Sequence, residues 1–294
     1  MLSYRHGYHA GNHADVLKHL VLLGLLQRLL SKDKPFTYID SHSGAGVYDL
    51  NSAEARLNTE HASGISRVWH SRSDDPLLSL YVGRVRALNE DGRLRWYPGS
   101  PMLAADCLRA EDHMHLLELH PAEVEELRFN HLHALGTHDR VSIHQRDAFE
   151  GLLAITPPEP RRGLALIDPA YEDKQDYQKV FNTVLKLQRR WPVGIIAVWY
   201  PLLARQRDRS AWLKSAFARE NLPNLLSIEL SVEEQAEEFG MHGSGMFIIN
   251  TPWQFREQMQ ATLGALMREL SAGCSFTIDS PGSVVTRGQA AFRQ

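Results

Sequence analysis

Short apolar runs alternate with longer segments of helical periodicity along most of the chain. The runs of strand length are residues 35–40, 113–119, 141–145, 163–168, 193–199, 225–232 and 245–250. Helical spacing covers residues 14–30, and Asn12 stands before this segment as a candidate N-cap. The later predicted helices begin near Pro121 and Ala148 or cover residues 174–190, 206–219 and 255–270.

Strands that alternate with helices predict an α/β fold built on a mainly parallel sheet with helices on both faces. Residues 47–95 break this rhythm, because they hold no convincing apolar strand and show helical spacing at 65–71 and 77–88. We therefore expect a main domain from residues 1–46 and 96–294, with an N-terminal motif and helix in 1–30. Residues 47–95 are expected to form a small helical insertion.

Composition is that of a globular protein, with 43% hydrophobic and 23% charged residues among 294. Two cysteines, Cys107 and Cys274, exclude a disulfide framework and a cysteine zinc site. The N-terminus is polar, and the longest apolar run, residues 20–26, is far shorter than the roughly 18 residues that span a bilayer. These features predict a cytoplasmic protein that does not enter membranes.

The charge balance is slightly acidic, with a net charge of −3 and a pI near 6.6, whereas nucleic-acid-binding proteins are usually basic. Residues 201–220 differ from this average, because the segment contains five basic residues and only two acidic ones, Asp208 and Glu220. The five are Arg205, Arg207, Arg209, Lys214 and Arg219. Such a run is typical of a solvated helix face, but it also suits contact with a phosphate backbone.

A glycine-rich turn, residues 40–46, follows the first predicted strand. Gly44 and Gly46 let the backbone turn sharply and approach a ligand, although an ordinary tight turn has the same pattern. Asp49 occupies the third glycine position of the dinucleotide pattern, which disfavours NAD and leaves a looser nucleoside site. Glu118, 74 residues after Gly44, ends the next long strand and could accept hydrogen bonds from ribose hydroxyls. The usual gap is about 20 residues, and the insertion accounts for the difference.

Asp147 follows the strand at 141–145 and directly precedes Ala148. A carboxylate in this place can accept a hydrogen bond from an adenine amine while the next backbone N–H meets a ring nitrogen. It can equally cap the following helix. The residues alone leave both interpretations open.

The most informative motif is Asp168-Pro169-Ala170-Tyr171, which follows an apolar strand. The N6 amine of adenine is a poor nucleophile because its lone pair is delocalised into the ring. The Asp168 carboxylate and the Pro169 carbonyl can accept hydrogen bonds from both amine hydrogens, and proline restricts the backbone that aims this carbonyl. Tyr171 would stack on the base. The motif therefore predicts transfer to an exocyclic amine.

The N-terminal segment, residues 4–19, interleaves aromatic and cationic side chains with four histidines. His9 and His13 have metal-ligand spacing, but without cysteine and with only Asp15 nearby a metal is disfavoured. Stacking on bases and contact with phosphates fit the composition better. A flexible polar terminus is the alternative.

Together these motifs resemble the bacterial RlmJ family, adenine-N6 methyltransferases of 23S ribosomal RNA. The matching segments are Tyr-Arg-His at 4–6, His-Ala-Gly-Asn-His-Ala-Asp-Val-Leu-Lys-His at 9–19, Asp-Ser-His-Ser-Gly-Ala-Gly at 40–46, Trp-Tyr-Pro-Gly-Ser-Pro at 96–101, Glu-Leu-His-Pro at 118–121, Ile-Asp-Pro at 167–169 and Trp-Tyr-Pro at 199–201. The resemblance covers nearly the whole chain and is loose only in the insertion and after residue 273.

The resemblance implies a class I methyltransferase fold with a seven-stranded sheet, and methyl transfer from S-adenosylmethionine, without a metal, to the adenine conventionally numbered 2030. The product would be S-adenosylhomocysteine, and the enzyme a monomer without an obligate protein partner. Asp168 would be catalytic, with Tyr4, His6 and Lys18 beside the substrate nucleotide. The residues implied to hold the cofactor are His19, His42, Ser100, Glu118, Asp147 and Ala148.

Two departures from the family pattern stand out. Ala170 replaces the second proline of the motif, and Ser43 replaces the usual alanine before Gly-Ala-Gly. Losing a proline relaxes the loop that aims the Pro169 carbonyl, so we expect activity to be retained but slowed. An adenine-N6 DNA methyltransferase and a non-catalytic nucleic-acid-binding protein with a degenerate methyltransferase fold remain as alternatives. A small-molecule methyltransferase fits less well, because such enzymes rarely carry Asp-Pro-x-Tyr.

Overall fold

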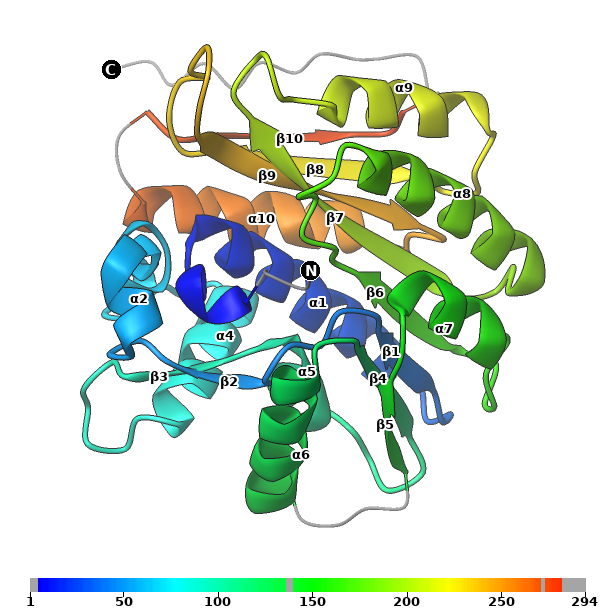
Figure 1. Cartoon of the computed structure of the whole chain (residues 1–294), viewed down its shortest axis with the longest axis horizontal. Coiled ribbons are helices and arrows are strands. Elements are labelled where there is room, and N and C mark those ends of the chain that lie inside the picture. The colour runs from blue at the N-terminus through cyan, green and yellow to red at the C-terminus, as the bar shows by residue number, and fades with distance from the viewer. Residues whose placement is uncertain (1–4, 136–139, 271–272, 282–294) are drawn as a thin grey trace.

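A central twisted sheet with helices on both faces forms the body of the molecule (Figure 1). The computed structural model describes residues 5–135, 140–270 and 273–281. Within these ranges the sheet has eight strands. Their order is β10 (Ser275–Asp279), β8 (Leu226–Ser231), β9 (Met241–Ile249), β7 (Ile195–Leu203), β6 (Gly163–Ile167), β1 (Thr37–Asp40), β4 (His113–Glu118) and β5 (Val141–Gln145).

The sheet is mostly parallel, as the sequence predicts. The five strands β5, β4, β1, β6 and β7 pair in parallel, whereas β9 runs antiparallel between β7 and β8. The predicted α/β class is confirmed, but the predicted seven strands are one too few. β10 pairs antiparallel with β8 at the edge, and its residues are only half-buried or exposed, so it carries no apolar run that the sequence pattern could reveal.

Seven helices flank the sheet in the main part of the described chain. They are α1 (His13–Leu30), α5 (Ser100–Ala105), α6 (Pro121–Leu135), α7 (Ala148–Ile155), α8 (Gln175–Arg190), α9 (Ser210–Arg219) and α10 (Phe255–Glu269). α1 and α10 share one hydrophobic cluster with one face of the sheet, while α7, α8 and α9 share a second cluster with the other face. Tyr38 and Ile39, neighbours on β1, point into different clusters, as strand alternation requires.

α1 is buried along most of its length, which explains why apolar residues occupy most of its faces. The Asn12 side chain accepts hydrogen bonds from the N–H groups of Ala14 and Asp15, both at 3.0 Å, so the predicted N-cap is confirmed. Charged residues within this buried helix require a specific partner. Asp15 and Lys18 are such residues, and they face the site described below.

Two strands and one helix differ in length from the prediction. β7 and β9 pair from Ile196 and Ile249 out to Leu203 and Met241, well beyond the predicted ends. A glycine hides this extension in β9, because a Cβ at Gly243 would lie 2.3 Å from the Leu230 carbonyl oxygen of the neighbouring strand. α9 begins at Ser210 instead of residue 206, because residues 204–208 form a turn.

Residues 47–95 contain four short helical segments and one strand. They are β2 (Val47–Asp49), α2 (Ala53–Asn58), η2 (Glu60–Ser63), α3 (Ile65–Val68) and α4 (Pro76–Ala87). β2 pairs antiparallel with β3 (Trp96–Pro98), although three residues were too short to predict a strand. Leu78 and Tyr81 of α4 belong to the same buried cluster as α1, so this segment packs into the common core. No helix in the described ranges is both long and apolar enough to cross a membrane.

Candidate active site

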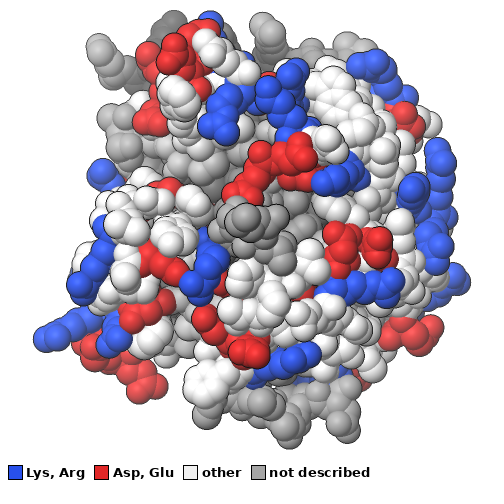
Figure 2. Space-filling view, in the orientation of Figure 1, with Lys and Arg blue, Asp and Glu red and all other residues white. Residues whose placement is uncertain are grey.

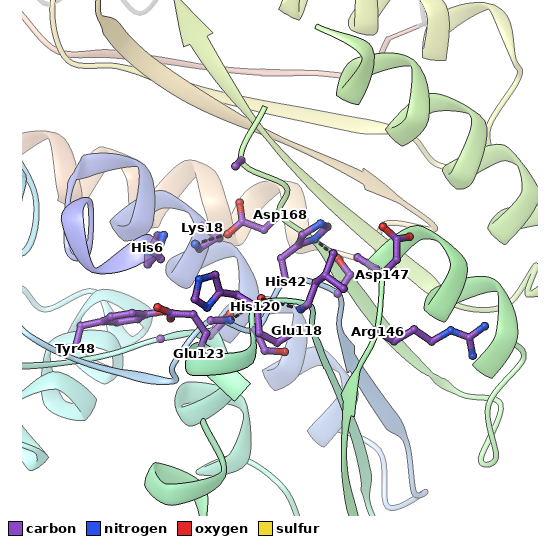
Figure 3. Close-up of a pocket in the computed structure, with 18 of the residues that line it drawn as sticks. His6, Lys18, His42, Tyr48, Glu118, His120, Glu123, Arg146, Asp147 and Asp168 are labelled. Carbon is purple, nitrogen blue, oxygen red and sulfur yellow. Dashed lines mark hydrogen bonds and ion pairs between the residues drawn. The ribbon is translucent and has the colours of Figure 1, made fainter. Parts of the chain in front are cut away.

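A cavity of about 230 Å³ lies at the carboxyl ends of β1, β4 and β6. The strand order reverses between β1 and β6, and ligands of open α/β sheets bind at such a point. Figure 3 shows side chains from several separate elements converging on this first cavity. The sequence-predicted residues that line it are His6, Lys18, His19, His42, Gly44, Ser100, Glu118, Asp147, Ala148 and Asp168.

Gly44 and Glu118 connect two of the walls. The Gly44 N–H donates to Glu118 Oε2 at 2.8 Å, and the N–H groups of Leu119 and His120 both donate to Oε1 at 2.8 Å. Gly44 has a φ of +57°, and a Cβ there would lie 2.1 Å from the Tyr48 hydroxyl. The turn therefore needs glycine, and the Glu118 carboxylate is held in one orientation while its remaining lone pairs stay available.

His42, Ser100 and Asp147 line the first cavity from three loops or helix starts. His42 Nδ1 lies 2.6 Å from the Ser41 hydroxyl, and burial lowers the pKa of His42 despite the nearby carboxylates. Asp147 accepts the N–H of Glu150 at 3.0 Å and so caps α7. Capping occupies one oxygen and leaves the other, so both interpretations of Asp147 are compatible.

His19 is a fully buried imidazole at the base of the first cavity. Its Nδ1 lies 2.8 Å from the Tyr97 hydroxyl, which in turn lies 3.0 Å from the Tyr81 hydroxyl. Burial lowers the pKa of His19 to about 3, so the ring is neutral. Among the described residues none pairs with its Nε2, which is a buried polar atom beside the cavity. The sequence patterns did not predict the contribution of Tyr97.

A chain of charged contacts runs from the N-terminal segment to the motif at 168–171. Lys18 Nζ lies 2.5 Å from Asp168 Oδ2 and 2.7 Å from Asp15 Oδ1, and His6 Nε2 lies 2.9 Å from Asp15 Oδ2. Asp15 also accepts the Gly11 N–H at 2.8 Å. Lys18 and Asp15 are almost fully buried, whereas Asp168 keeps 13% side-chain exposure toward the cavities. Figure 3 shows Lys18 reaching Asp168 from α1.

The charges in this chain stabilise one another. Burial opposes ionisation of Lys18, but the two carboxylates outweigh it and raise the pKa of Lys18. Burial likewise acts against Asp15, yet His6 and Lys18 hold the pKa of Asp15 well below 3.8. From the sequence, Asp15 was considered only as a metal ligand. The signal that could have predicted its ion pair with Lys18 is the i,i+3 spacing of the two residues on an otherwise apolar helix.

A second cavity of about 330 Å³ adjoins the first and shares His6, Lys18, Asp168, Ala170 and Glu172 with it. Tyr171, Trp199 and Pro201 provide its aromatic and apolar side. The two cavities therefore meet at the Lys18–Asp168 pair, and each has its own polar rim.

Tyr171 is held in an unusual backbone conformation at the edge of the second cavity. Its φ is +52°, a left-handed value that a bulky residue rarely adopts. The hydroxyl donates to the Trp199 carbonyl at 2.8 Å, and the ring packs against Tyr177 with centroids 4.5 Å apart. The residue is only 7% exposed, and it is one of the residues that line the second cavity.

Two sequence-predicted residues line neither cavity, and a third is not described. Pro169 is buried between Asp168 and Ala170 and does not itself line either cavity. Gly46, with a φ of +79°, accepts the Gly99 N–H at 2.7 Å and shapes the turn from outside the cavity. Tyr4 lies outside the described residues. Across the described ranges, no group of three or more His, Cys, Asp or Glu side chains is arranged to hold a metal ion.

Comparisons with known proteins show what the whole chain is similar to. A family model described as "Ribosomal RNA large subunit methyltransferase D, RlmJ" matches residues 33–278. The chain is 42% identical over 270 residues to ribosomal RNA large subunit methyltransferase J of Escherichia coli K12, covering 92% of this chain and 94% of that protein. The Haemophilus influenzae protein of the same name is 40% identical over 271 residues, with the same coverage. A crystal structure from Legionella pneumophila superposes with a TM-score of 0.83 at 33% identity, covering 93% of this chain and 98% of that one.

Proposed function

The chain belongs to the RlmJ family of ribosomal RNA large subunit methyltransferases, which methylate an adenine of 23S ribosomal RNA, and from this premise we propose that the acceptor is the N6 amine of that adenine and the donor S-adenosylmethionine. When bound, the donor supplies an electrophilic methyl group on a sulfonium. The alternatives of a DNA substrate and of a non-catalytic scaffold are weaker on this premise.

The first cavity suits the donor. Glu118 is fixed by three N–H groups and keeps lone pairs that suit ribose hydroxyls. The glycine turn at residue 44 brings backbone to the cavity where a side chain would collide with Tyr48. His19 Nε2 is a buried polar atom whose partner a ligand would supply. Asp147 and Ala148 would meet the adenine of the donor, and His42 and Ser100 would complete the wall.

The second cavity suits the acceptor adenine. Asp168 would accept a hydrogen bond from N6, and the Pro169 carbonyl would accept the other, which keeps electron density on the nitrogen as it becomes tetrahedral. Lys18 Nζ lies 2.5 Å from the Asp168 carboxylate and fixes its orientation. Tyr171 and Trp199 would contact the base through their rings. His6 and Tyr4 would lie beside the nucleotide.

The observation that carries the proposal is the position of Asp168 where the two cavities meet. A donor in one cavity and a base in the other would come together at this carboxylate. Much of the rate would come from that alignment. The adenine must leave its stack to enter, which costs a few kcal/mol in a duplex.

The decisive variant is Asp168→Ala. We expect this variant not to methylate 23S ribosomal RNA, because the amine loses its hydrogen-bond acceptor. Mass mapping of N6-methyladenine in the RNA measures the loss. Binding of S-adenosylmethionine, measured by calorimetry, should remain, since the first cavity keeps its other walls. Normal methylation by this variant would remove Asp168 from the reaction. Equal methylation of DNA and RNA of the same sequence would contradict the RNA assignment.

We further propose that the enzyme works in the cytoplasm, where ribosomal RNA is made, and as a single chain. The residues assigned above to the donor and the acceptor all belong to this chain, so the proposed reaction requires no side chain from a second copy. Two residues at the donor–acceptor junction, His6 and Lys18, belong to the N-terminal segment, so this segment completes the site.

A further inference from the structure

The turn between β7 and α9 presents arginines from a fixed backbone. Residues 204–209 pair with the loop before β9: the N–H groups of Ala204, Arg205 and Gln206 donate to carbonyls of residues 240, 236 and 237 at 3.0 to 3.2 Å. The turn is closed by the N–H of Arg207, which donates to the Ala204 carbonyl at 2.9 Å. Arginines on this turn are therefore held in place at their backbone.

Arg207 and Arg209 are exposed cations without a carboxylate partner in the described chain. Their neighbour Arg205 approaches Glu237 at 3.8 Å, and Asp208 is occupied by the N–H of Ser210 at 2.7 Å and the Gln235 amide at 3.3 Å. Figure 2 shows basic side chains gathered on this part of the face, over the stretch between β7 and α9. Two guanidinium groups are thus available to an outside anion.

Arg207 stands at the mouth of the second cavity. It is one of the residues that line this cavity, together with Gly240 and Met241 from the loop that pairs with the turn. Arg209 follows two residues later on the same turn and is also exposed. Tyr171 and Pro201 line the same cavity, so Arg207 shares it with the loop that would hold the base.

The other charged groups that the structure describes around the second cavity do not offer a free cation. His6, His9 and Lys18 line the cavity, but each is paired with a carboxylate, His6 and Lys18 with Asp15 and His9 with Glu60. Glu172 lines the cavity on the side of the Asp168 loop and would repel a phosphate. The exposed arginine at the β7–α9 turn is therefore the favourable side for an RNA backbone.

We propose that Arg207 and Arg209 bind the backbone phosphates that flank the target nucleotide and so orient the RNA strand as its adenine enters the second cavity. The proposal rests on the proposed function, and it adds which wall of the molecule receives the strand. An unstacked nucleotide leaves its two flanking phosphates at the cavity mouth. Guanidinium groups bind phosphate in a bidentate manner, and such contacts fix register without reading sequence.

The experiment compares the double variant R207Q/R209Q with R72Q/R93Q, which removes two exposed arginines from the segment at residues 47–95. We expect KM for an RNA substrate to rise about tenfold in R207Q/R209Q only, since each lost phosphate contact weakens binding. The KM for S-adenosylmethionine and kcat at saturating RNA should stay within twofold of the parent. The slope of log binding constant against log salt should fall by roughly 1 to 2, because two phosphate contacts are lost.

A second arm locates the phosphates. An RNA oligonucleotide carrying neutral methylphosphonate linkages on both sides of the target adenine should bind the parent protein about tenfold more weakly than unmodified RNA. R207Q/R209Q should not distinguish the two oligonucleotides, because the interacting charges are already absent. The proposed phosphate contact is wrong if the neutral linkages weaken RNA binding by the same factor in the parent and in R207Q/R209Q. It is also wrong if R207Q/R209Q binds RNA as R72Q/R93Q does.

Failure of this inference and failure of the proposed function give different results. If the parent protein does not methylate RNA at all, the proposed function fails. If it methylates RNA normally and the parent and both double variants share one KM for RNA, only the role of Arg207 and Arg209 fails. The variant R207K/R209K provides the complementary check. It should recover the salt slope but only part of the affinity, because lysine supplies charge without the bidentate geometry.

Discussion

Lys18 shows why a charged residue can occupy a buried helix. Its ammonium lies between Asp15 at 2.7 Å and Asp168 at 2.5 Å, so the cost of burying the charge is offset by two close carboxylates. Asp168 must remain available to the acceptor amine, whereas Asp15 has no assigned contact with either ligand. Asp15 therefore holds Lys18 and, through it, the orientation of Asp168.

The variant Asp15→Asn tests this positioning role. We expect kcat for RNA methylation to fall about 10- to 100-fold, because Lys18 and His6 lose their common anchor and the reacting groups shift. Binding of S-adenosylmethionine, measured by calorimetry, should change little. The control is Asp112→Asn, which removes another fully buried carboxylate, paired with Arg109 at 3.0 Å beside the start of β1. This control should lose stability but keep kcat, and an equal loss of kcat in both variants would make Asp15 merely structural.

The same variant has a defined dependence on pH. The folded protein holds the pKa of Asp15 well below 3.8, so the ionised carboxylate contributes stability at neutral pH. That contribution is lost as the pH falls below about 3.8 toward the lowered pKa, because the unfolded state takes up a proton on Asp15 at a higher pH than the folded state does. The difference in free energy of unfolding between the parent and D15N should therefore be largest near neutral pH and shrink in acid. Denaturant titrations across this range measure it.

At the scale of single residues, sequence reasoning found side chains but not their partners. Glu118, Asp147 and Asp168 follow directly from strand ends, because carboxyl ends of parallel strands meet at one edge. The contact between Lys18 and Asp168 spans 150 positions and depends on how α1 crosses the sheet. Tyr171 was expected to stack freely on a base, but its backbone conformation and the hydrogen bond to Trp199 became visible only in three dimensions.

At the scale of elements, the turn after β1 depends on glycine for two separate reasons. Gly44 has a positive φ, and the space for a Cβ is taken by the Tyr48 hydroxyl at 2.1 Å. Gly92 has a φ of +74° with nothing within 4 Å, so it shares only the first reason. Comparing Gly44 with Gly92 therefore separates the free-energy cost of a positive φ from the cost of a steric collision at Cβ.

The prediction concerns Gly44→Ala against Gly92→Ala. Both should lose about 1–2 kcal/mol of unfolding free energy, because alanine is strained in the left-handed region. Gly44→Ala should lose roughly 1 kcal/mol more and should also weaken S-adenosylmethionine binding, since Tyr48 and the backbone beside Glu118 must shift. Urea unfolding and calorimetry measure the two effects. Equal donor affinity in both variants would show that the turn does not touch the donor.

Predictability of the elements follows burial. Strands buried on both faces, such as β1 and β6, stand out as apolar runs, and α1 is apolar on most faces. β10 was missed because it is an edge strand with exposed positions. The extended end of β9 was missed because Gly243 stands where an apolar residue would mark a strand, and a side chain there would collide with the neighbouring strand β8.

At the scale of the whole molecule, the two cavities share one scaffold because residues 47–95 pack into the core of the main sheet. α4 lies against α1, the helix that carries Lys18 and His19, and Tyr81 contributes to the hydrogen-bonded contacts that hold His19. The break in strand–helix alternation predicted where this segment begins and ends. It could not predict the packing, because the same amphipathic helices would suit a detached domain equally well.

Shared packing predicts that damage to the insertion destabilises the entire protein. Leu78 in α4 is fully buried against the common cluster, so Leu78→Ala should cost about 2–5 kcal/mol of global unfolding free energy. Leu57, 75% exposed in α2, is the matched control, and Leu57→Ala should stay within about 0.5 kcal/mol of the parent. In native-state hydrogen exchange, amides of α1 and β1 should lose protection together with those of α4, because one cooperative unit opens. Faster exchange confined to residues 53–87 would instead show that the segment unfolds independently. The stability of the site residues on α1 would then not depend on it.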